Sequence, residues 1–338
     1  MKQRHLASVG AVVAGIVALA AMAAAQAPGS APLTPDGHPD LQGVWTFRTI
    51  TPLERPRELA NKPTLTAEEA AAYEKQVNRA QNRDLIDPKS GGAGVYVPDT
   101  EGGVVPYNEF WYERGNKIVG SRRTSLIVDP PDGRLPSLTP QGQKKADARR
   151  DIGNQEQHGR AFADNPENRG VGDRCLMGFN AGPPMVPGAY NQNVQIVQAP
   201  GYFVLVNEMI HNARVIPVDG RLHGVIRQWA GDSRGRWEGD TLVVDTTNFY
   251  RETSLQGSGR GMHLVERFTR VAPDRINYEF IVDNPDTWTK PWTAIVPLVK
   301  LEDQVARIFE YACQEGNYSL EGVLRGARLA EQSKGAKK

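Results

Sequence analysis

The sequence predicts a mainly β protein, an antiparallel β-barrel or sandwich with an irregular, helix-containing N-terminal half. Three observations favour this fold class. Short segments rich in Val, Ile, Tyr, Phe and Thr recur from residue 194 to residue 313, and Gly, Pro, Asp or Asn bounds them. No long helical pattern alternates with these segments, which argues against a layered α/β fold. The first half contains long Gly- and Pro-rich stretches that cannot build a core of their own.

Four regions are expected along the 338 residues. In residues 1–25, Lys2 and Arg4 precede an apolar run that ends in small residues, as in a secretory signal peptide. Residues 26–190 form the irregular region, which packs on an antiparallel β-domain at 191–330, and residues 331–338 form a disordered tail. The signal peptide predicts a periplasmic or secreted protein, with a retained membrane anchor as the alternative.

Two helices are predicted in the first half and nine strands in the second. The first helix covers residues 65–81, where Thr66 and Glu69 make a capping box, and the second begins at Thr139 and Pro140. The segment Gly43–Phe47 is expected to join the sheet as a further strand. The nine predicted strands are VQIVQ, YFVLVNEM, ARVIPV, GVIRQW, TLVVDTTNF, HLVERFTRV, RINYEFIVD, WTAIVPLVKL and ARIFEYAC.

The two cysteines, Cys175 and Cys313, predict one disulfide in an exported chain. Such a bond closes a loop of about 138 residues and contributes about 4–5 kcal/mol in the chain-entropy model. Two buried thiols are the alternative.

The pentapeptide Gly231–Gly235, GDSRG, matches the G-x-S-x-G pattern of the α/β-hydrolase nucleophile elbow. An elbow requires a helix after the serine, whereas the β-branched run Thr241–Thr247 follows here. The triad also requires an acid and then a histidine downstream, and His263 follows too soon for the helices of that fold. We therefore interpret the pentapeptide as a hairpin loop, with Ser233 as a turn residue.

Charged side chains interrupt several of the apolar strands, and two explanations are open. An antiparallel sheet carries charges on a solvated face, or a barrel holds paired Glu and Arg in a partly polar interior. Under the second explanation the candidate acid–base and anion-holding residues are Glu208, His211, Arg214, Glu266 and Arg267. The candidate ligand-binding residues are Trp229, Trp237, Tyr278 and Glu310.

Composition narrows the class of partner. The net charge is +1, so no global field attracts nucleic acid or, after signal cleavage, an anionic membrane. The histidines lack metal-ligand spacing, and QGSGRGMH lacks the dinucleotide fingerprint, so neither a metal nor an organic cofactor is predicted. The first hypothesis is therefore an exported small-molecule-binding protein. The second is a lyase, isomerase or hydrolase that uses a Glu/His/Arg group in the same pocket. Oligomeric state is not predicted.

The segments WAGDSRGRWEGDTLVVDTTNF, ERF, KPW and EYACQEGNY resemble a family of exported proteins from environmental bacteria without an assigned function. The resemblance covers roughly residues 170–328, with a weaker likeness at PDLQGVW. It implies that the second half of the chain is one unit. It implies no activity and no catalytic residues.

Overall fold

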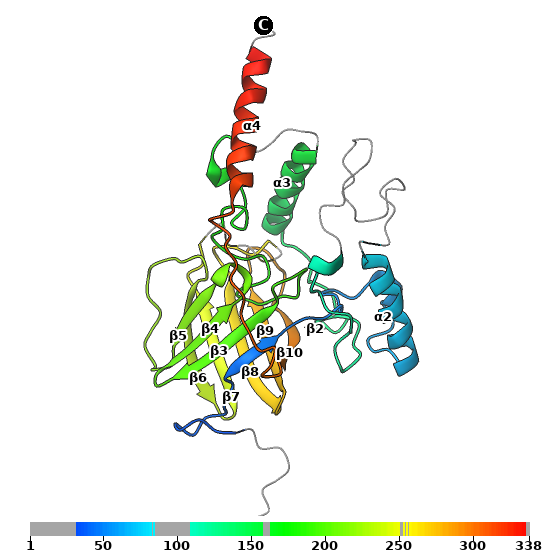
Figure 1. The fold of residues 1–338 in the computed structure, drawn as a ribbon, viewed down its shortest axis with the longest axis vertical. Coiled ribbons are helices and arrows are strands. Elements are labelled where there is room, and N and C mark those ends of the chain that lie inside the picture. Colours follow the sequence, from blue (N-terminus) through cyan, green and yellow to red (C-terminus); the bar gives the residue numbers. More distant parts are fainter. Residues whose placement is uncertain are drawn as a thin grey trace, which may run out of the picture.

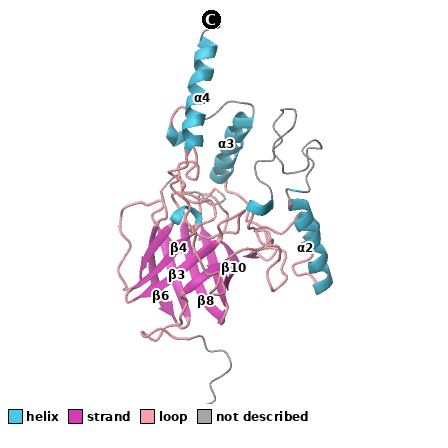
Figure 2. Ribbon diagram, in the orientation of Figure 1, coloured by secondary structure: helices cyan, strands magenta, loops and turns pink. Residues whose placement is uncertain are grey.

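The computed structural model describes residues 32–82, 84, 109–157, 163–250, 253, 255 and 257–335. Its centre is a barrel-like antiparallel sheet, which confirms the predicted fold class (Figure 1). Helices and loops gather at the upper end and along one side of this sheet (Figure 2). The predicted signal peptide, residues 1–25, lies outside the described residues.

Nine strands are joined edge to edge in the order β5-β4-β3-β1-β10-β9-β8-β7-β6. Apart from β1, which lies between β3 and β10, neighbours in the sheet are also neighbours in the chain. A short further strand, β2, pairs with β10. The bounds are β1 Gly43–Thr46, β2 Ile127–Asp129, β3 Asn193–Ala199, β4 Tyr202–Asn207, β5 Ala213–Pro217, β6 Asp232–Glu238, β7 Thr241–Thr247, β8 His263–Ala272, β9 Arg275–Asp283 and β10 Trp292–Lys300.

The two end strands of this order, β5 and β6, meet without joining the hydrogen-bonded path. Each neighbouring pair along the path is antiparallel, so nine strands leave β5 and β6 running in the same direction. Parallel neighbours require a crossover connection rather than a hairpin, and residues 218–231 supply it. We call the contact between β5 and β6 the seam of the barrel.

The barrel is filled by one face of each strand. In β9, for example, Ile276, Tyr278, Phe280 and Val282 are buried and alternate with more exposed neighbours. The expected strand at Gly43–Phe47 is confirmed as β1, whose Trp45 is fully buried. The largest fully buried side chains among the described residues are Trp45, Trp292, Tyr278, Phe47, Phe203, Phe249, Phe268 and Phe280.

Both helices predicted in the N-terminal half are present. In α2, Ala67–Gln81, the Thr66 side chain accepts from Glu69 N, and the Glu69 carboxylate accepts from Thr66 N. The helix α3, Pro140–Gln157, begins with proline, and Thr139 Oγ1 accepts from Gly142 N. Single 3₁₀ turns occur at Arg57–Leu59, Glu109–Trp111, Pro166–Asn168 and Met209–His211.

Three predictions about elements of the second half are wrong. The segments 224–229 and 306–313 are not strands, and GDSRG is not a hairpin loop, since Asp232 opens the strand β6. A further helix of the described chain, α4, covers Tyr318–Gly335. It includes residues 331–335, which the sequence assigned to a disordered tail. Its start has a cap that the prediction overlooked, because Asn317 Oδ1 accepts from Leu320 N at 3.4 Å.

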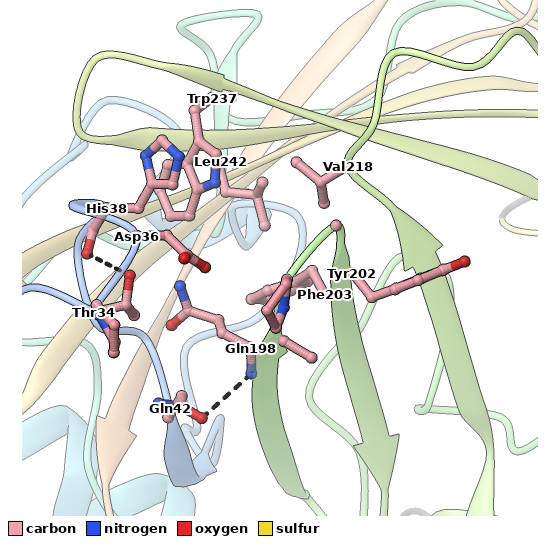
Figure 3. Close-up of a pocket in the computed structure, with 14 residues that line it drawn as sticks. Thr34, Asp36, His38, Gln42, Gln198, Tyr202, Phe203, Val218, Trp237 and Leu242 are labelled. Atoms are coloured by element: carbon pink, nitrogen blue, oxygen red, sulfur yellow. Dashed lines mark hydrogen bonds between the residues drawn. The ribbon is translucent and has the colours of Figure 1, made fainter.

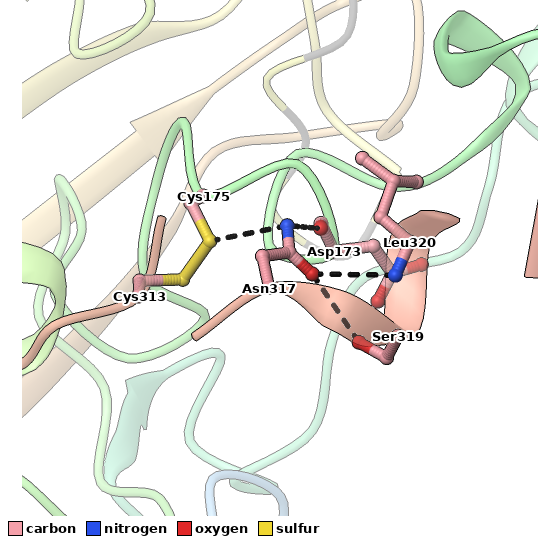
Figure 4. Close-up of a disulfide and its surroundings, with 6 residues drawn as sticks. All are labelled: Asp173, Cys175, Cys313, Asn317, Ser319 and Leu320. Atoms are coloured by element: carbon pink, nitrogen blue, oxygen red, sulfur yellow. Dashed lines mark hydrogen bonds between the residues drawn. A yellow bond between two sulfur atoms is a disulfide. The ribbon is translucent and has the colours of Figure 1, made fainter. Parts of the chain in front are cut away.

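The predicted disulfide between Cys175 and Cys313 is present, with Cα atoms 5.8 Å apart (Figure 4). It joins the segment below α4 to the loop that covers the upper end of the barrel. Asn317 reinforces this connection, since its Nδ2 donates to Asp173 O at 2.8 Å. The disulfide therefore attaches the C-terminal segment to the N-terminal half of the chain.

Candidate functional site

A cavity of about 580 Å³ opens at the lower end of the barrel, and we call it the lower pocket. It lies beneath the seam, between the β3–β4 turn, the end of β5, the β6–β7 hairpin and an N-terminal arm, residues 32–42 (Figure 3). Phe203 and Leu242, which are fully buried, connect it to the core. The other lining residues are Thr34, Pro35, Asp36, His38, Gln42, Gln198, Ala199, Pro200, Gly201, Tyr202, Val218 and Trp237.

One wall of the lower pocket is a stack of two rings. Trp237 faces inward near the end of β6, directly opposite Leu242 on β7. The imidazole of His38 lies on this indole with ring centroids 4.6 Å apart and an interplanar angle of 6°. The sequence predicted Trp237 as a ligand-binding residue, and it is the one predicted site residue that lines this pocket.

The arm that carries His38 is held by a side chain of the barrel. Gln198 on β3 accepts from Leu41 N at 2.6 Å and donates to Pro39 O at 3.1 Å, so its amide is satisfied at both ends. The arm turns at Gly37, where φ is +79°, a value that glycine adopts without strain. The barrel thus positions the arm, and the arm supplies five of the fourteen residues that line the lower pocket.

Several polar groups of the lower pocket have no hydrogen-bond or ion-pair partner among the described residues, and two of them bear on the ligand. Within the described residues, the Asp36 carboxylate makes no hydrogen bond or ion pair, and it projects toward the middle of the pocket (Figure 3). The indole N–H of Trp237 likewise has no acceptor there. In the part of the chain that the structure describes, neither Lys nor Arg lines the cavity. The pocket therefore offers a carboxylate, an N–H donor and flat apolar surface to a ligand.

A second set of predicted residues lies inside the barrel as a closed network. Arg214 on β5 donates to both Glu266 oxygens, at 3.0 and 2.6 Å, and Tyr278 Oη donates to Glu266 Oε1 at 2.7 Å. Burial alone would lower the pKa of Arg214, but the charge and hydrogen bonds of Glu266 hold it above its ordinary value. Burial, and then the Glu266 charge, raise the pKa of Tyr278.

This network spans the seam. Arg214 Nη2 also donates to Ser233 on β6 at 3.0 Å and to Thr246 on β7 at 3.4 Å. The Arg214 side chain therefore connects β5 to β6, β7 and β8 across the seam. Among the described strands, no backbone hydrogen-bond ladder joins β5 to β6. Ser233, the central residue of GDSRG, is buried in this network, so the interpretation of it as a turn residue is wrong. Its hydroxyl contacts Arg214 and Thr246.

Two further candidates, Glu208 and His211, lie near the upper end of the barrel. Glu208 is buried, and its two oxygens accept from the side-chain amides of Asn191 at 2.7 Å and Asn193 at 2.8 Å. His211 is exposed, and its Nε2 accepts from Tyr311 N at 2.8 Å. Both therefore hold chain segments together, and neither lines the lower pocket.

The remaining candidates are dispersed. Arg267 faces outward from β8 and pairs with Glu238 at 3.0 Å. Trp229 lies in the crossover and packs against Tyr250, with ring centroids 4.6 Å apart and an interplanar angle of 36°. Glu310 is exposed in the segment that was predicted to be a strand. The predicted catalytic and ligand-binding residues thus form one buried group of three, Arg214, Glu266 and Tyr278, and several separate positions, and they do not share one pocket.

Sequence reasoning missed a cluster of two histidines and two aspartates on the outer face of β6–β8. Asp245 accepts from His223 Nε2 at 2.9 Å and from His263 Nε2 at 2.8 Å. His223 Nδ1 faces Asp232 at 3.2 Å. The hydrogen bond to Asp245 raises the pKa of His263, and the same bond lowers that of Asp245. Alternating positions 243, 245 and 247 on β7 were the available signal that Asp245 faces outward.

Within the described ranges, His, Cys, Asp and Glu side chains form no group suited to holding a metal ion. No helix in the described part of the chain is long and apolar enough to cross a membrane. Comparison with models of protein families, with curated proteins and with solved structures gives no match.

Proposed function

We propose that this protein is exported and binds a small ring-bearing molecule, neutral or cationic, in the lower pocket. The observation that carries the proposal is the combination of the stacked His38–Trp237 wall with the unpartnered Asp36 carboxylate in one cavity. The volume, about 580 Å³, falls within the range of small-molecule sites.

The lining supports this class of ligand. Flat apolar walls favour a ring, because stacking on aromatic side chains adds to the burial of apolar area. A cationic group near Asp36 would gain a charge-assisted hydrogen bond, and a hydroxyl or carbonyl oxygen would satisfy the Trp237 N–H. An anionic ligand is disfavoured, because the described lining carries the negative charge of Asp36 and no Lys or Arg that could balance a second negative charge.

Export rests on the disulfide and on the predicted signal peptide. A bond between Cys175 and Cys313 is typical of proteins that fold in an oxidising compartment. Expression of the full chain in a bacterial host, followed by cell fractionation and thiol alkylation, tests this. We expect a processed chain in the periplasmic fraction whose thiols do not react until a reductant is added. A full-length, alkylatable chain in the cytoplasm would contradict export.

Tryptophan fluorescence of the mature protein tests the binding proposal. The panel is benzyl alcohol, benzylamine and benzoate, which share one ring and differ in charge, together with neutral sugars, phenols and terpenoids. We expect quenching or a spectral shift with neutral or cationic ring compounds and none with benzoate. The reporter is Trp237, so Trp237→Phe removes the signal, while Trp229→Phe at the other end of the barrel keeps it.

Affinity then identifies the role of the carboxylate. Asp36→Asn is expected to weaken benzylamine binding about tenfold or more, since one charge-assisted bond contributes about 1.5–3 kcal/mol. Benzyl alcohol binding should remain unchanged in this variant. Binding of benzoate equal to that of benzylamine, or an equal loss of signal in Trp229→Phe and Trp237→Phe, would refute the proposed site.

A second candidate function, a cofactor-free acid–base enzyme, is favoured by the His263–Asp245 contact. The bond from Nε2 to Asp245 orients the imidazole, and its Nδ1 has no partner among the described residues. A ring held in this way can transfer a proton at its outward nitrogen near neutral pH. Product formation in a substrate screen that disappears in His263→Gln but persists in Arg236→Gln would support this function. Turnover that persists in His263→Gln would exclude it.

A further inference from the structure

A second cavity, of about 390 Å³, lies on the outer wall of the barrel. Its described lining residues are all different from those of the lower pocket. It forms where the loop at residues 117–123 covers the outward faces of β9 and β10. On these strands Arg275, Asn277, Ile295 and Pro297 point outward, since Ile276 and its alternating neighbours are buried. We call this cavity the side pocket.

The side pocket has a strongly one-sided charge. Among the described residues, four cationic side chains line it, and no aspartate or glutamate does. Two of the four are neutralised elsewhere, because Arg48 pairs with Glu113 at 3.2 Å and Lys117 pairs with Glu74 at 2.8 Å. The other two are Arg123 and Arg275.

These two arginines lack a close carboxylate within the described ranges of the chain. Arg123 donates to Ser125 O at 3.0 Å, to Ser121 Oγ at 3.4 Å and to Ile295 O, all of them neutral acceptors. Burial lowers the pKa of Arg123 below its ordinary value. Arg275 has only the exposed Asp274 within reach, at 3.9 Å. An anion in the side pocket would supply the countercharge that the protein does not.

The remaining lining defines the rest of the ligand. Asn277 is exposed and has no hydrogen-bond partner in the described part of the chain, so its amide is available to an oxyanion. The other walls are largely apolar and consist of Ile118, Val119, Val271, Ile295, Pro297 and Val299. A concave site with two guanidinium groups in its lining and apolar walls suits a small amphipathic anion.

We propose that the side pocket binds the carboxylate or phosphate group of a small molecule, with the apolar part of that molecule against the β10 wall. Arg275 and Arg123 hold the oxyanion through charge-assisted hydrogen bonds, and Asn277 donates a further one. The site is independent of the lower pocket, because the two cavities share no lining residue and prefer ligands of opposite charge.

Isothermal titration of the mature protein in a low-salt buffer without phosphate tests this inference. The titrants are hexanoate, hexyl phosphate, inorganic phosphate and hexanol. We expect both hexyl anions to bind, inorganic phosphate to bind more weakly, and hexanol not to bind. Added salt should weaken the binding of both hexyl anions, since the attraction is electrostatic. Binding of hexanol as tight as that of hexanoate, or binding of inorganic phosphate alone, would overturn the proposal.

The decisive variant is Arg275→Gln, because this side chain is exposed and its loss does not disturb the core. We expect it to weaken binding of the better hexyl anion about tenfold or more. Arg236→Gln, an exposed arginine of β6 that pairs with Glu238, is the matched control and should bind like the wild type. Arg123→Gln should also weaken binding, with circular dichroism as the check on folding. Unchanged affinity in Arg275→Gln would refute the site.

Discussion

Replacing Glu266 with leucine tests whether the buried network closes the barrel. The Glu266 carboxylate accepts three hydrogen bonds, two from Arg214 and one from Tyr278. Its side chain is fully buried and that of Arg214 is 3 % exposed, so water cannot replace these bonds. Arg214 is also the side chain that connects β5 to β6 and β7 across the seam.

The expected cost follows from these contacts. Glu266→Leu leaves a buried guanidinium without its countercharge, which costs about 3–5 kcal/mol in other proteins. Tyr278 also loses its acceptor, which adds about 1–3 kcal/mol. Arg214→Met should cost a comparable amount for the opposite reason. The double replacement removes both charges, so we expect it to be more stable than the sum of the single effects predicts, by about 3 kcal/mol.

Urea unfolding with the disulfide intact, followed by circular dichroism and tryptophan fluorescence, measures all four members of this cycle. The matched control is the pair Arg267–Glu279, which lies on β8 and β9 facing outward with 3.8 Å between Nε and Oε1. Such a partly exposed pair should couple by less than about 1 kcal/mol. Coupling of Arg214 and Glu266 below about 0.5 kcal/mol would refute the reasoning.

Three further predictions concern the backbone conformation at Gly231, the disulfide and the pH dependence of stability. Gly231→Ala should destabilise by about 2 kcal/mol or more in thermal unfolding, because φ is +71° and a Cβ there would lie 2.8 Å from a backbone oxygen; an unchanged midpoint would contradict this. Replacing Cys175 and Cys313 by serine should cost about 4–5 kcal/mol in urea unfolding, since the bond closes a long loop; a loss below about 1 kcal/mol would refute it. His263, whose pKa is raised by its bond to Asp245, stabilises the fold fully below about pH 6.5, and this contribution is lost as pH rises through the folded-state pKa. The pKa of Asp245 is lowered, so its contribution is present above its usual pKa and is lost as pH falls through the folded-state value. Urea unfolding from pH 5.5 to 9 should show the histidine contribution in the wild type and not in His263→Gln, and equal profiles would contradict it.

Strands with a regular apolar alternation and helices with explicit caps were predictable from the sequence. RINYEFIVD became β9 with the predicted bounds, because large apolar residues occupy each inward position. The α2 helix was predictable because Thr66 and Glu69 satisfy its first backbone groups within the segment itself. These signals are local, and the barrel adds nothing that contradicts them.

The strand β6 was not predictable from its own pattern. Its inward positions are Ser233, Gly235 and Trp237, and only the last of them resembles a core residue. The reason lies across the seam, where Ile216 and Val218 already fill the space beside Gly235. A small residue is therefore required at a position where the sequence pattern predicts a large one.

The opposite error occurred at ARIFEYAC, which has the composition of a strand but lies outside the sheet. Both sides of β10 are already occupied by β1 and β9, so the chain that follows it has no adjacent edge to extend. β-propensity describes how a segment fits a sheet, and it does not say whether an edge is available.

The candidate sites, like the strands, were predictable only where the signal is local in the sequence. The sequence by itself determined the antiparallel β class, the two N-terminal helices, the pairing of the only two cysteines and the aromatic supply that includes Trp237. Only the tertiary structure decided which charges meet, because contacts such as Arg214–Glu266 and Asp245–His263 join residues that are distant along the chain. It also decided that GDSRG opens a strand and that the N-terminal arm completes a pocket, since both depend on how the sheet curls back on itself.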